Sequence, residues 1–520
     1  MVDNKLSLGI ELGSTRIKGV LIDDNAKAVF SGVYAWESSQ INGCWTYSLE
    51  DAIKGVQQVY SQIDKSYFEK NNNHIHELAS IGISAMMHGY IPLDENYKQL
   101  DIFKTWKNSF CEIEAKELSE LFHFNVPQRW SVTHLYQAFL KKEPYINDIR
   151  YMNTLAGYIH YVLTNEHVLG IGDASGMFPI DIQTNMYDKK MSDLFYNKTN
   201  IDIKSIFPKV LCAGEIAGYL TEDGAKILDV NGNLRPNIPF CAPEGDMQTG
   251  MVATNSIAIN TGNISAGTSI NAMVITKNKL KNYYPEIDVV LTPNGNCAAL
   301  VHCASCSSDI NEWVYLFNDV LKTFDVNVST NDLFEKLFIK AENEKPGKEE
   351  YLSYNFVAGE PILGLEDGCP IFSRGANSKL SIGTFMASLI YSAFSGIKIG
   401  IDALCNRENI TIDKFIGHGG IFKTEGIAQQ ILANALNVPI YVTETSGEGG
   451  AYGIALLASY IISKSEFHDL EEYLTEFVYK NVDTSVRLPQ ISGVEDFLLF
   501  INRYKRCLDA EKEIYSNIRP

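Results

Sequence analysis

The sequence is short of positive charge, since 44 lysines and arginines stand against 63 aspartates and glutamates and give a formal net charge of −19. A surface with this balance repels the phosphates of nucleic acids and of anionic membranes. We therefore expect neither a nucleic acid nor a membrane as a partner. An anionic substrate such as a nucleotide must then be held by local hydrogen-bond donors and a metal ion, not by the field of the whole protein.

The sequence also lacks a targeting or membrane-spanning signal. Its first residues, MVDNKLSLGIELG, show no basic segment followed by an apolar one, and no uninterrupted apolar run is long enough to cross a bilayer. The ten cysteines include one close pair, Cys303 and Cys306, without a second pair or a matching histidine cluster. A redox or zinc role needs such a partner, so we favour buried free thiols. These features predict a cytoplasmic protein with reduced thiols.

A third absence is that of a low-complexity linker. At 520 residues the chain is too long for a single core. Its composition, 45% hydrophobic and 21% charged, is that of a soluble globular protein. We expect two tightly joined domains, residues 1–252 and 253–520, with amphipathic helices from about residue 466 folding back on them. The oligomeric state stays open, with a homodimer as the candidate assembly.

Two similar stretches lie half a chain apart. Residues 10–15 (IELGST) and 264–269 (ISAGTS) both read Ile-x-x-Gly-[Ser/Thr]-[Ser/Thr], between apolar segments that predict two short strands and a tight turn. Glycine lets the backbone approach a ligand, and hydroxyls beside free N–H groups form a cradle for an anion. Either turn alone could simply reverse the chain. Two copies indicate a duplicated domain whose hairpins face one nucleotide from opposite sides.

The sequence of the first domain predicts strands and a helix in a characteristic order. Strands are expected at 6–12, 17–22 and 28–34, then a helix capped by Ser48, then a strand at 78–85. This order matches the start of a ribonuclease-H-like domain, the fold shared by actin, the heat-shock chaperone ATPases and hexokinase. Ligand residues of open α/β sheets lie at the carboxyl ends of strands, where Glu11 and His88 fall.

Several polar residues are candidates for an acceptor site. His88 could be a structural histidine, but Trp106 and Asn108 follow shortly and suit stacking on, and hydrogen bonding to, a polyol. Asp173 could be a helix cap or support the site indirectly, and we favour a structural role. Asp246 follows an apolar strand and begins a run of small residues, so it is either a helix cap or the general base for a hydroxyl.

A second glycine-rich turn follows the strand expected near 415–417. Gly419 and Gly420 would let a flat base lie against the backbone, with Thr424 just beyond. A later run of small residues, 448–453, predicts the start of a closely packed helix.

In this order the motifs resemble those of the FGGY carbohydrate kinases, from about residue 6 to about residue 458. The resemblance implies an α/β fold of two ribonuclease-H-like domains with an interdomain cleft, and ATP with Mg²⁺ as donor and metal. Residues 11–18 resemble the first phosphate motif, 262–269 the second, and 417–429 the adenosine motif. The segments at Met87 and Asp173 are similar to the xylulokinase branch, in which the Met-His pair touches the ketose.

The resemblance also implies roles for particular residues. Asp246 would be the general base, and Glu11 and Asp246 would hold Mg²⁺. The nucleotide would be bound by Gly13, Ser14, Thr15, Lys18, Gly267, Thr268, Ser269, Gly419, Gly420 and Thr424, and the sugar by Met87, His88, Trp106, Asn108 and Asp246. The sequence departs from the family pattern at Glu11, where aspartate is usual, and at Asn108, which replaces an aspartate.

The function expected from these roles is phosphorylation of a ketopentose such as xylulose. Ribulose, sedoheptulose, glycerol or another polyol are alternatives of the same class. A nucleotide-binding regulator of the actin or chaperone type, without transferase activity, is the alternative of a different class, and the departure at Glu11 favours it. Met87, His88, Trp106 and Asp246 favour the kinase, because a regulator has no use for an acceptor site.

Overall fold

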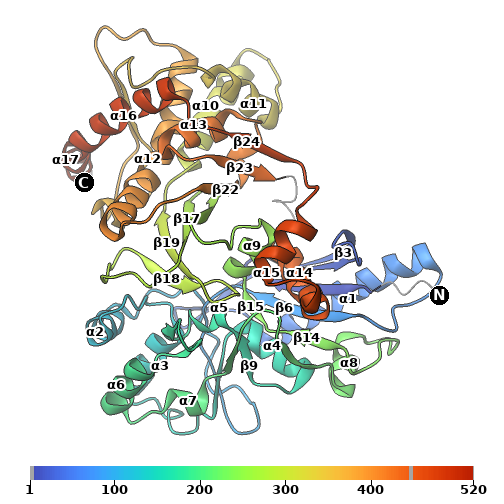
Figure 1. Ribbon diagram of the computed structural model, residues 1–520. Helices are drawn as coiled ribbons and strands as arrows, with labels where there is room; N and C mark the ends of the chain where they lie inside the picture. Colours follow the sequence, from blue (N-terminus) through green and yellow to red (C-terminus); the bar gives the residue numbers. More distant parts are fainter. Residues whose placement is uncertain (1–4, 444–448, 519–520) are drawn as a thin grey trace.

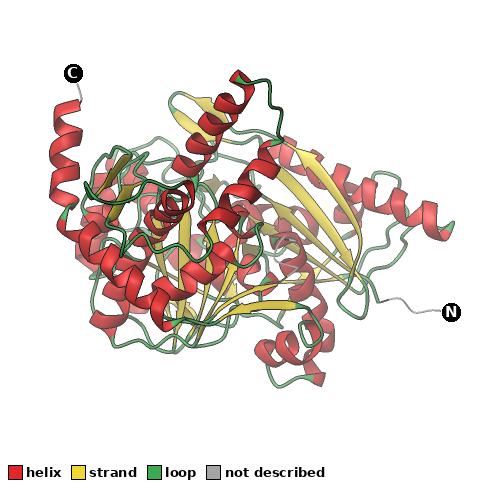
Figure 2. Ribbon diagram, turned by 90° about the horizontal axis from the view of Figure 1, so that it is seen from above, coloured by secondary structure: helices red, strands yellow, loops and turns green. Residues whose placement is uncertain are grey.

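The computed structural model describes residues 5–443 and 449–518. The chain forms two domains, each built on a mixed seven-stranded sheet flanked by helices (Figure 1). Seen from above, the helices lie around both groups of strands (Figure 2). This arrangement confirms the predicted α/β class with two domains.

The first sheet has the order β13-β14-β6-β1-β2-β3, with β15 paired to β6. β2 runs antiparallel to β1 and β3, whereas β6 runs parallel to β1. Ser48 caps α1 and accepts a hydrogen bond from the Asp51 N–H at 3.2 Å, as predicted. The strands of this sheet are β1 (Ser7–Leu12), β2 (Arg16–Ile22), β3 (Ala28–Ala35), β6 (Ser80–Ala85), β13 (Ile216–Tyr219), β14 (Pro239–Cys241) and β15 (Glu244–Gly245).

The second sheet has the order β18-β19-β17-β16-β22-β23-β24. Its edge strand β24 corrects the expectation of a wholly helical tail, because residues 484–487 pair antiparallel with β23. The run Thr-Ser-Val-Arg is too short for its alternation to stand out beside the charged helices around it. The strands are β16 (Thr261–Ala266), β17 (Ile270–Thr276), β18 (Asp288–Leu291), β19 (Cys297–Cys303), β22 (Lys414–His418), β23 (Ile440–Thr443) and β24 (Thr484–Arg487).

The remaining strands form two-stranded sheets outside the main ones. They pair as β4 (Ser39–Ile41) with β5 (Cys44–Thr46), β7 (Ile91–Leu93) with β8 (Tyr151–Asn153), β9 (Val168–Gly170) with β12 (Lys209–Leu211), β10 (Ile180–Asp181) with β11 (Met186–Tyr187), and β20 (Tyr351–Tyr354) with β21 (Ile371–Arg374).

The helices surround the sheets in chain order. In the first half they are α1 (Leu49–Asn71), α2 (Glu112–Phe122), α3 (Ser131–Leu140), α4 (Leu155–Thr164), α5 (Ile171–Ala174), α6 (Lys189–Thr199), α7 (Ile203–Ile206), α8 (Glu222–Leu228) and α9 (Asp246–Ala253). In the second half they are α10 (Ser308–Thr323), α11 (Thr330–Ala341), α12 (Ile382–Glu408), α13 (Ile427–Leu436), α14 (Gly450–Ser463), α15 (Leu470–Glu472), α16 (Ile491–Arg506) and α17 (Leu508–Ile518). Short 3₁₀ turns occur at Pro361–Leu363, Gly420–Phe422 and Lys464–Glu466, and a π-helix at Tyr473–Val478.

One described helix, α12, is long and apolar enough to cross a membrane by length and composition. Because 83% of its most apolar window is buried inside the protein, we read it as a core helix of the second domain. The sequence showed no uninterrupted apolar run long enough to cross a membrane, and the structure adds that α12 has the length and composition but is mostly buried. Cys303 and Cys306 lie in the same core as buried free thiols, as expected.

Helix α14 comes late in the chain but packs on the first sheet (Figure 1). Two glycines make this close approach feasible. A Cβ on Gly9 of β1 would lie 2.2 Å from the Ala451 carbonyl oxygen, and one on Gly453 would lie 1.9 Å from that of Thr249 in α9. The N-terminus of α14 is thereby brought against both β1 and α9.

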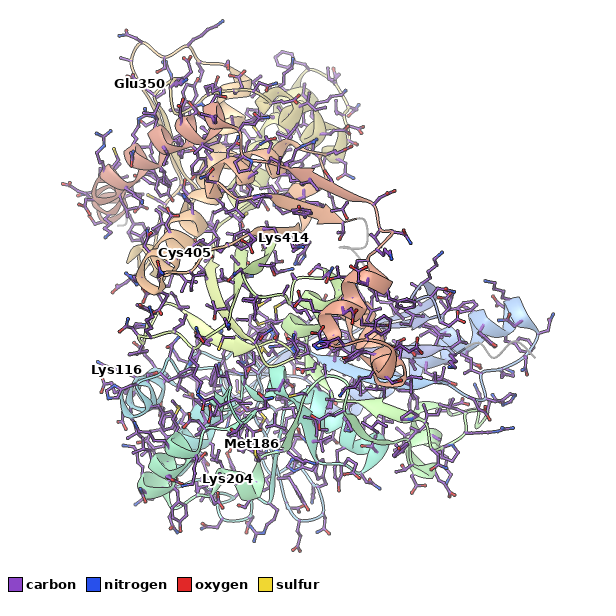
Figure 3. The ribbon with its side chains drawn as sticks, viewed as in Figure 1. Lys116, Met186, Lys204, Glu350, Cys405 and Lys414 are labelled. Carbon is purple, nitrogen blue, oxygen red and sulfur yellow. The ribbon has the colours of Figure 1, made fainter. Side chains whose placement is uncertain are left out.

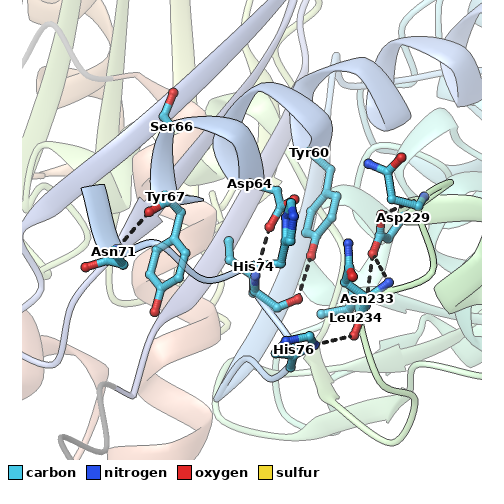
Figure 4. A network of polar contacts seen from close by, with 12 residues as sticks. Tyr60, Asp64, Ser66, Tyr67, Asn71, His74, His76, Asp229, Asn233 and Leu234 are labelled. Atoms are coloured by element: carbon cyan, nitrogen blue, oxygen red, sulfur yellow. Dashed lines mark hydrogen bonds and ion pairs between the residues drawn. The ribbon is translucent and has the colours of Figure 1, made fainter. Parts of the chain in front are cut away.

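The end of α1 is tied to the rest of the first domain by a polar network (Figure 4). Asp64 accepts hydrogen bonds from His74 Nδ1 at 2.7 Å and from the Ile75 N–H at 2.8 Å. His76 Nδ1 bonds the Asn233 carbonyl at 3.0 Å, which joins this loop to the segment after α8. The network lies far from the glycine turns along the chain and joins α1 to the segment after α8.

The two domains also meet through side chains. Arg129 forms an ion pair with Asp288 of β18, and Asn125 Nδ2 donates to the same carboxylate at 2.7 Å. Side chains fill the space between the ribbons, and Lys414 at the start of β22 lies on the side of the second domain that faces the first (Figure 3). The first residues of β22 thus lie close to the domain boundary.

Candidate functional site

The first glycine turn joins β1 to β2, as predicted. The Gly13 N–H bonds the Arg16 carbonyl at 3.0 Å and closes the turn. Its carbonyls are held from one side, because Trp36 Nε1 donates to Gly13 O and Tyr47 Oη donates to Ser14 O, both at 2.7 Å. The N–H groups of Ser14 and Thr15 form no hydrogen bond within the described part of the chain and are available to an anion.

Glu11 and Lys18 face each other across this hairpin as a register pair. The Ala451 N–H, in the first turn of α14, donates to Glu11 Oε2 at 3.2 Å. Burial and the nearby Asp246 raise the pKa of Glu11 to about 7, while Lys18 and the Ala451 bond act in the opposite direction. The longer glutamate side chain therefore reaches a helix N-terminus, a favourable place for a carboxylate.

Asp246 is the first residue of α9, and Gly245, not Asp246, occupies the N-cap position. Asp246 Oδ1 accepts a hydrogen bond from the Met87 N–H at 3.1 Å, which joins the ends of β6 and β15. Burial raises the pKa of Asp246 to about 6, and the bonds from backbone N–H groups limit this rise. The carboxyl is thus positioned by the backbone and titrates close to neutrality, as suits a general base.

His88 follows Met87 directly and is buried. Its φ of 65° is unusual for a residue other than glycine. Its Nδ1 lies 3.3 Å from the Gly176 carbonyl, and its ring is stacked with Trp130 at 6.3 Å between centroids. Burial lowers the pKa of His88 well below its usual range, with Arg129 adding to the effect, so the ring is neutral.

The second glycine turn joins β16 to β17 and is also fixed through its carbonyls. Cys306 N–H donates to Thr268 O at 2.8 Å, and Ser307 Oγ donates to Gly267 O at 2.7 Å. The Thr268 and Ser269 N–H groups form no hydrogen bond in residues 5–443 and 449–518. This turn therefore has the same kind of open donors as the first.

Gly419 lies directly against the second turn. Its φ is 114°, and a Cβ there would lie 2.2 Å from the Ala266 carbonyl oxygen. Gly420 has open space at its own Cβ position, and Thr424 lies half-buried in the bend before α13. Backbone contact thus joins the glycine-rich turn after β22 to the second hairpin. Glu448 lies outside the described residues.

Within the described residues, the hydrogen bonds of Asn108 go to Trp45 and Thr105, and the Trp106 ring contact is with Lys107; none of these interactions reaches Met87, His88 or Asp246. Both ends of the Asn108 amide bond the backbone of Trp45, each at 2.8 Å. Trp106 is 42% exposed, with the Lys107 ammonium 5.9 Å from its ring centre. Asn108 Nδ2 also donates to the Thr105 carbonyl at 3.1 Å, so both of its N–H groups are engaged and the side chain fixes the β4–β5 hairpin in this structure.

Two buried residues near Asp246 were missed from the sequence. Glu244 accepts hydrogen bonds from the N–H groups of Gly172 and Asp173, at 3.2 and 2.8 Å. Gln248 Nε2 donates to the Leu291 carbonyl of β18 at 3.0 Å and ties α9 to the second sheet. The only sequence signal was their place in the segment 244–248 around Asp246.

Asp173 shares this buried region. Thr154 Oγ1 donates to its Oδ2 at 2.7 Å, while Oδ1 has no partner in the part of the chain described. Burial raises the pKa of Asp173 to about 7, with Asp246 adding to the rise, and burial together with Asp173 raises that of Glu244 to about 8. Asp173 is not an N-cap, since that position of α5 belongs to Gly170.

No cluster of three or more metal-ligating side chains occurs among the described residues. The pair Glu11 and Asp246 nevertheless fits Mg²⁺, because each is partly exposed and Asp246 raises the pKa of Glu11. A divalent cation would relieve that repulsion, and Mg²⁺ needs few protein ligands since it retains several waters.

Comparison with known proteins places these features in a family. Models of the FGGY family of carbohydrate kinases match residues 6–253 (N-terminal domain) and 262–462 (C-terminal domain). The xylulose kinase of Haemophilus influenzae is 23% identical over 98% of this chain and 100% of its own, and the gluconokinase of Bacillus subtilis is 22% identical over 91% of each.

Solved structures show the same fold. The xylulose kinase of Rhodospirillum rubrum superposes with a TM-score of 0.79 at 15% identity, covering 98% of this chain and 100% of that one. The gluconate kinase of Lactobacillus acidophilus superposes with a TM-score of 0.80 at 17% identity, covering 99% and 100%.

Proposed function

Because the chain belongs to the FGGY family of carbohydrate kinases, whose members use ATP as phosphoryl donor, we propose that its acceptor is a ketopentose such as xylulose. The observation that carries this proposal is the junction of Asp246 with Met87 and His88. A carboxyl with a pKa of about 6 is bonded to the backbone beside a neutral, buried histidine. This arrangement supports Asp246 as the base, because its carboxyl lies beside groups that suit a sugar hydroxyl.

In the proposed reaction Asp246 accepts the proton of the attacking hydroxyl and orients its oxygen toward the γ-phosphorus. The oxygen forms a bond to phosphorus as the bond to the β,γ-bridging oxygen breaks. Lys18 and the open N–H groups of the two glycine turns stabilise the phosphate charge. The proton stays on Asp246 until it is released to solvent.

Glu11 and Asp246 would hold Mg²⁺, with Glu11 acting through water. When bound, the ion supplies charge neutralisation at the phosphates. The Ala451 bond positions Glu11 for this role, since it fixes one carboxylate oxygen and leaves the other free.

Gly419, Gly420 and Thr424 would hold the adenosine, and Met87 and His88 the sugar. For Trp106 we keep a sugar-binding role as a proposal, on the ground of its exposed ring. Asn108 has the least support as a sugar-binding residue, because both ends of its amide are engaged. We also propose a cytoplasmic location and a small-molecule sugar or polyol as the partner.

The alternative within the class is another acceptor, and the relatives include a gluconokinase as well as xylulose kinases. The alternative of a nucleotide-binding regulator rested on Glu11. Its hydrogen bond to Ala451 speaks for a retained site, because the longer side chain is used rather than displaced.

The test is consumption of Mg-ATP with a panel of ketoses, polyols and sugar acids. We expect one acceptor to raise turnover at least about tenfold, since the acceptor completes the closed site. Asp246→Asn is the matched control and should remove the stimulation. A protein that binds ATP but responds to no acceptor would support the regulator.

A further inference from the structure

A cavity of about 640 Å³ lies beside the loop between β2 and β3. Its size is in the range of pockets that hold small molecules. Its walls come from that loop, from the first turn of α14 and from the segment after α15, and the residues assigned above to the nucleotide, the metal ion and the sugar are not part of its lining. The cavity is therefore distinct from the candidate active site.

The polar lining of this cavity is basic, although the protein carries a formal net charge of −19. Lys27 and Lys480 face it from two different walls, with the amides of Asn25 and Asn481 beside them. Lys27 forms no ion pair within the described residues, and Lys480 is 3.8 Å from Glu476, with the two side chains 63% and 60% exposed. Such an exposed pair is weak, so both ammonium groups are available to an anion.

The kind of cation in the lining favours a phosphate over a carboxylate. The lining holds lysines and no arginine. A lysine ammonium is a compact point charge that suits the several oxygens of a phosphate, whereas the planar fork of arginine matches a planar carboxylate.

The apolar side of the cavity is formed by Phe477 and Val482. The Phe477 ring is 37% exposed and belongs to the π-helix Tyr473–Val478, which ends with a hydrogen bond from the Tyr479 N–H to the Leu474 carbonyl at 2.8 Å. Single π-helical turns are rare and occur frequently at functional sites. An exposed ring at the wall of a cavity offers a stacking surface to the body of a small ligand.

Two neighbouring residues of α14 join this cavity to Glu11. Tyr452 lines the cavity, and its hydroxyl donates to the Ala26 carbonyl of the β2–β3 loop at 2.9 Å. Ala451, directly before it, donates its N–H to Glu11 Oε2 at 3.2 Å. Ala26 has a φ of 58°, which alanine rarely adopts, so contacts such as the one from Tyr452 hold the loop in this conformation. A ligand that bridges the loop and the segment after α15 would therefore also hold the first turn of α14.

We propose that this cavity is a second binding site, which takes a small phosphate ester and stabilises the position of α14 in which Ala451 holds Glu11. Lys27 and Lys480 receive the phosphate, and Phe477 contacts the body of the ligand. A nucleoside monophosphate and a sugar phosphate share this chemistry. The site itself goes beyond the proposed function and does not depend on it, whereas its effect on Glu11 rests on the proposed kinase.

Binding is measured by calorimetry and by hydrogen exchange, with AMP, ribose 5-phosphate and adenosine as probes. We expect at least one of the two phosphate esters to protect residues 473–482 of the wild type from exchange. Lys27→Met should lose this protection and bind the ester at this site about tenfold more weakly, because one charged donor is removed. Lys336→Met is the matched control, since it removes an exposed lysine of α11, and it should behave as the wild type.

The three probes also identify the source of the phosphate. Tighter binding of AMP than of ribose 5-phosphate would show that a base stacks on Phe477, and equal binding would show that the sugar phosphate is the recognised part. Adenosine that protects residues 473–482 as well as AMP does would overturn the phosphate site. Absence of protection by all three probes would overturn the binding site altogether.

The effect on Glu11 is measured as the free Mg²⁺ needed for half-maximal turnover, at a fixed ATP concentration, with and without the tighter ester. The ester should lower this requirement by roughly fivefold, the low end of coupling between two sites. Tyr452→Phe removes the hydroxyl that holds the Ala26 carbonyl and keeps the ring, so it should still bind the ester but lose most of the effect. Binding with an unchanged Mg²⁺ requirement would overturn the link to Glu11. A protein that no acceptor stimulates would overturn the proposed function, while protection of residues 473–482 would still decide whether the second site exists.

Discussion

The two glycine hairpins have the same sequence pattern but differ in the groups around them. In the first hairpin the last paired residues are Leu12 and Ile17, with four residues between them. In the second they are Ala266 and Ile270, with three residues between them. At matching positions two residues before the glycine, the first has Glu11 paired with Lys18 and the second has Ser265 paired with Asn271. The first turn is thus charged and the second neutral.

This difference indicates that the two copies of the hairpin have different roles. Both turns offer open N–H groups, which suffice to hold phosphate oxygens. The first also has two carboxylates close together, because α14 and α9 bring Ala451 and Asp246 to Glu11. We infer that phosphoryl transfer is carried out at the first hairpin, while the second holds the nucleotide.

We expect the largest loss of turnover from substitution of Asp246, beside the first hairpin. Asp246→Asn keeps the shape and the Met87 hydrogen bond but cannot accept the proton, so turnover should fall by roughly 10²–10⁴. Nucleotide affinity, measured by calorimetry, should stay the same. Near-normal turnover would move the base elsewhere, with Asp173 as the next candidate.

A smaller effect is expected from Gly419 at the second hairpin. Gly419→Ala adds a Cβ 2.2 Å from the Ala266 oxygen at a φ of 114°, so the turn must shift. We expect ATP affinity to fall by about tenfold or more, or about 1.4 kcal/mol. Gly232→Ala is the control, because its φ is also positive but its Cβ position is open. Equal losses in both variants would point to general strain instead.

The smallest effect is a pH dependence of stability without metal. The pKa of Glu11 is raised to about 7 in the folded state, so between about pH 4.5 and pH 7 the folded protein binds more protons than the unfolded one. The contribution of Glu11 to the free energy of unfolding is therefore fully present below pH 4.5 and is lost as the pH rises to about 7. Relative to wild type, Glu11→Gln should gain about 1 kcal/mol in the free energy of unfolding from pH 5 to pH 8.

The measurement is denaturant unfolding in EDTA at both pH values. Ser265→Ala is the matched control, since serine does not titrate and its difference from wild type should be flat. If the difference in unfolding free energy between Glu11→Gln and the wild type is also the same at both pH values, the pKa of Glu11 is not raised in the folded protein.

Much of this arrangement could be predicted from the sequence, because it depends on local patterns. Apolar residues predicted the two strands of the first hairpin to within about one residue, and the Ser48 cap was readable from its spacing. The second hairpin was expected within residues 257–275, and its strands lie at Thr261–Ala266 and Ile270–Thr276. The order of short motifs was enough to assign the family. These features are set by neighbours in the chain.

Other features depend on contacts between distant segments and left no local signal. The engagement of Asn108 depends on Trp45, the contact of Glu11 depends on Ala451, and the buried position of Glu244 depends on Gly170. Strand β24 is too short to show a period of its own. In each case tertiary packing decided what the residue does.

The most direct test of the division between the hairpins is a magnesium titration of acceptor-stimulated ATP turnover for wild type, Glu11→Asp, Glu11→Gln and Ser265→Ala. We predict that Glu11→Asp lowers turnover by losing the reach to Ala451, and that Glu11→Gln lowers it further, both with a raised Mg²⁺ requirement. Ser265→Ala should keep the wild-type Mg²⁺ requirement. A Gln variant that matches the wild type at every magnesium concentration would contradict the account, because Glu11 would then have no role in metal binding.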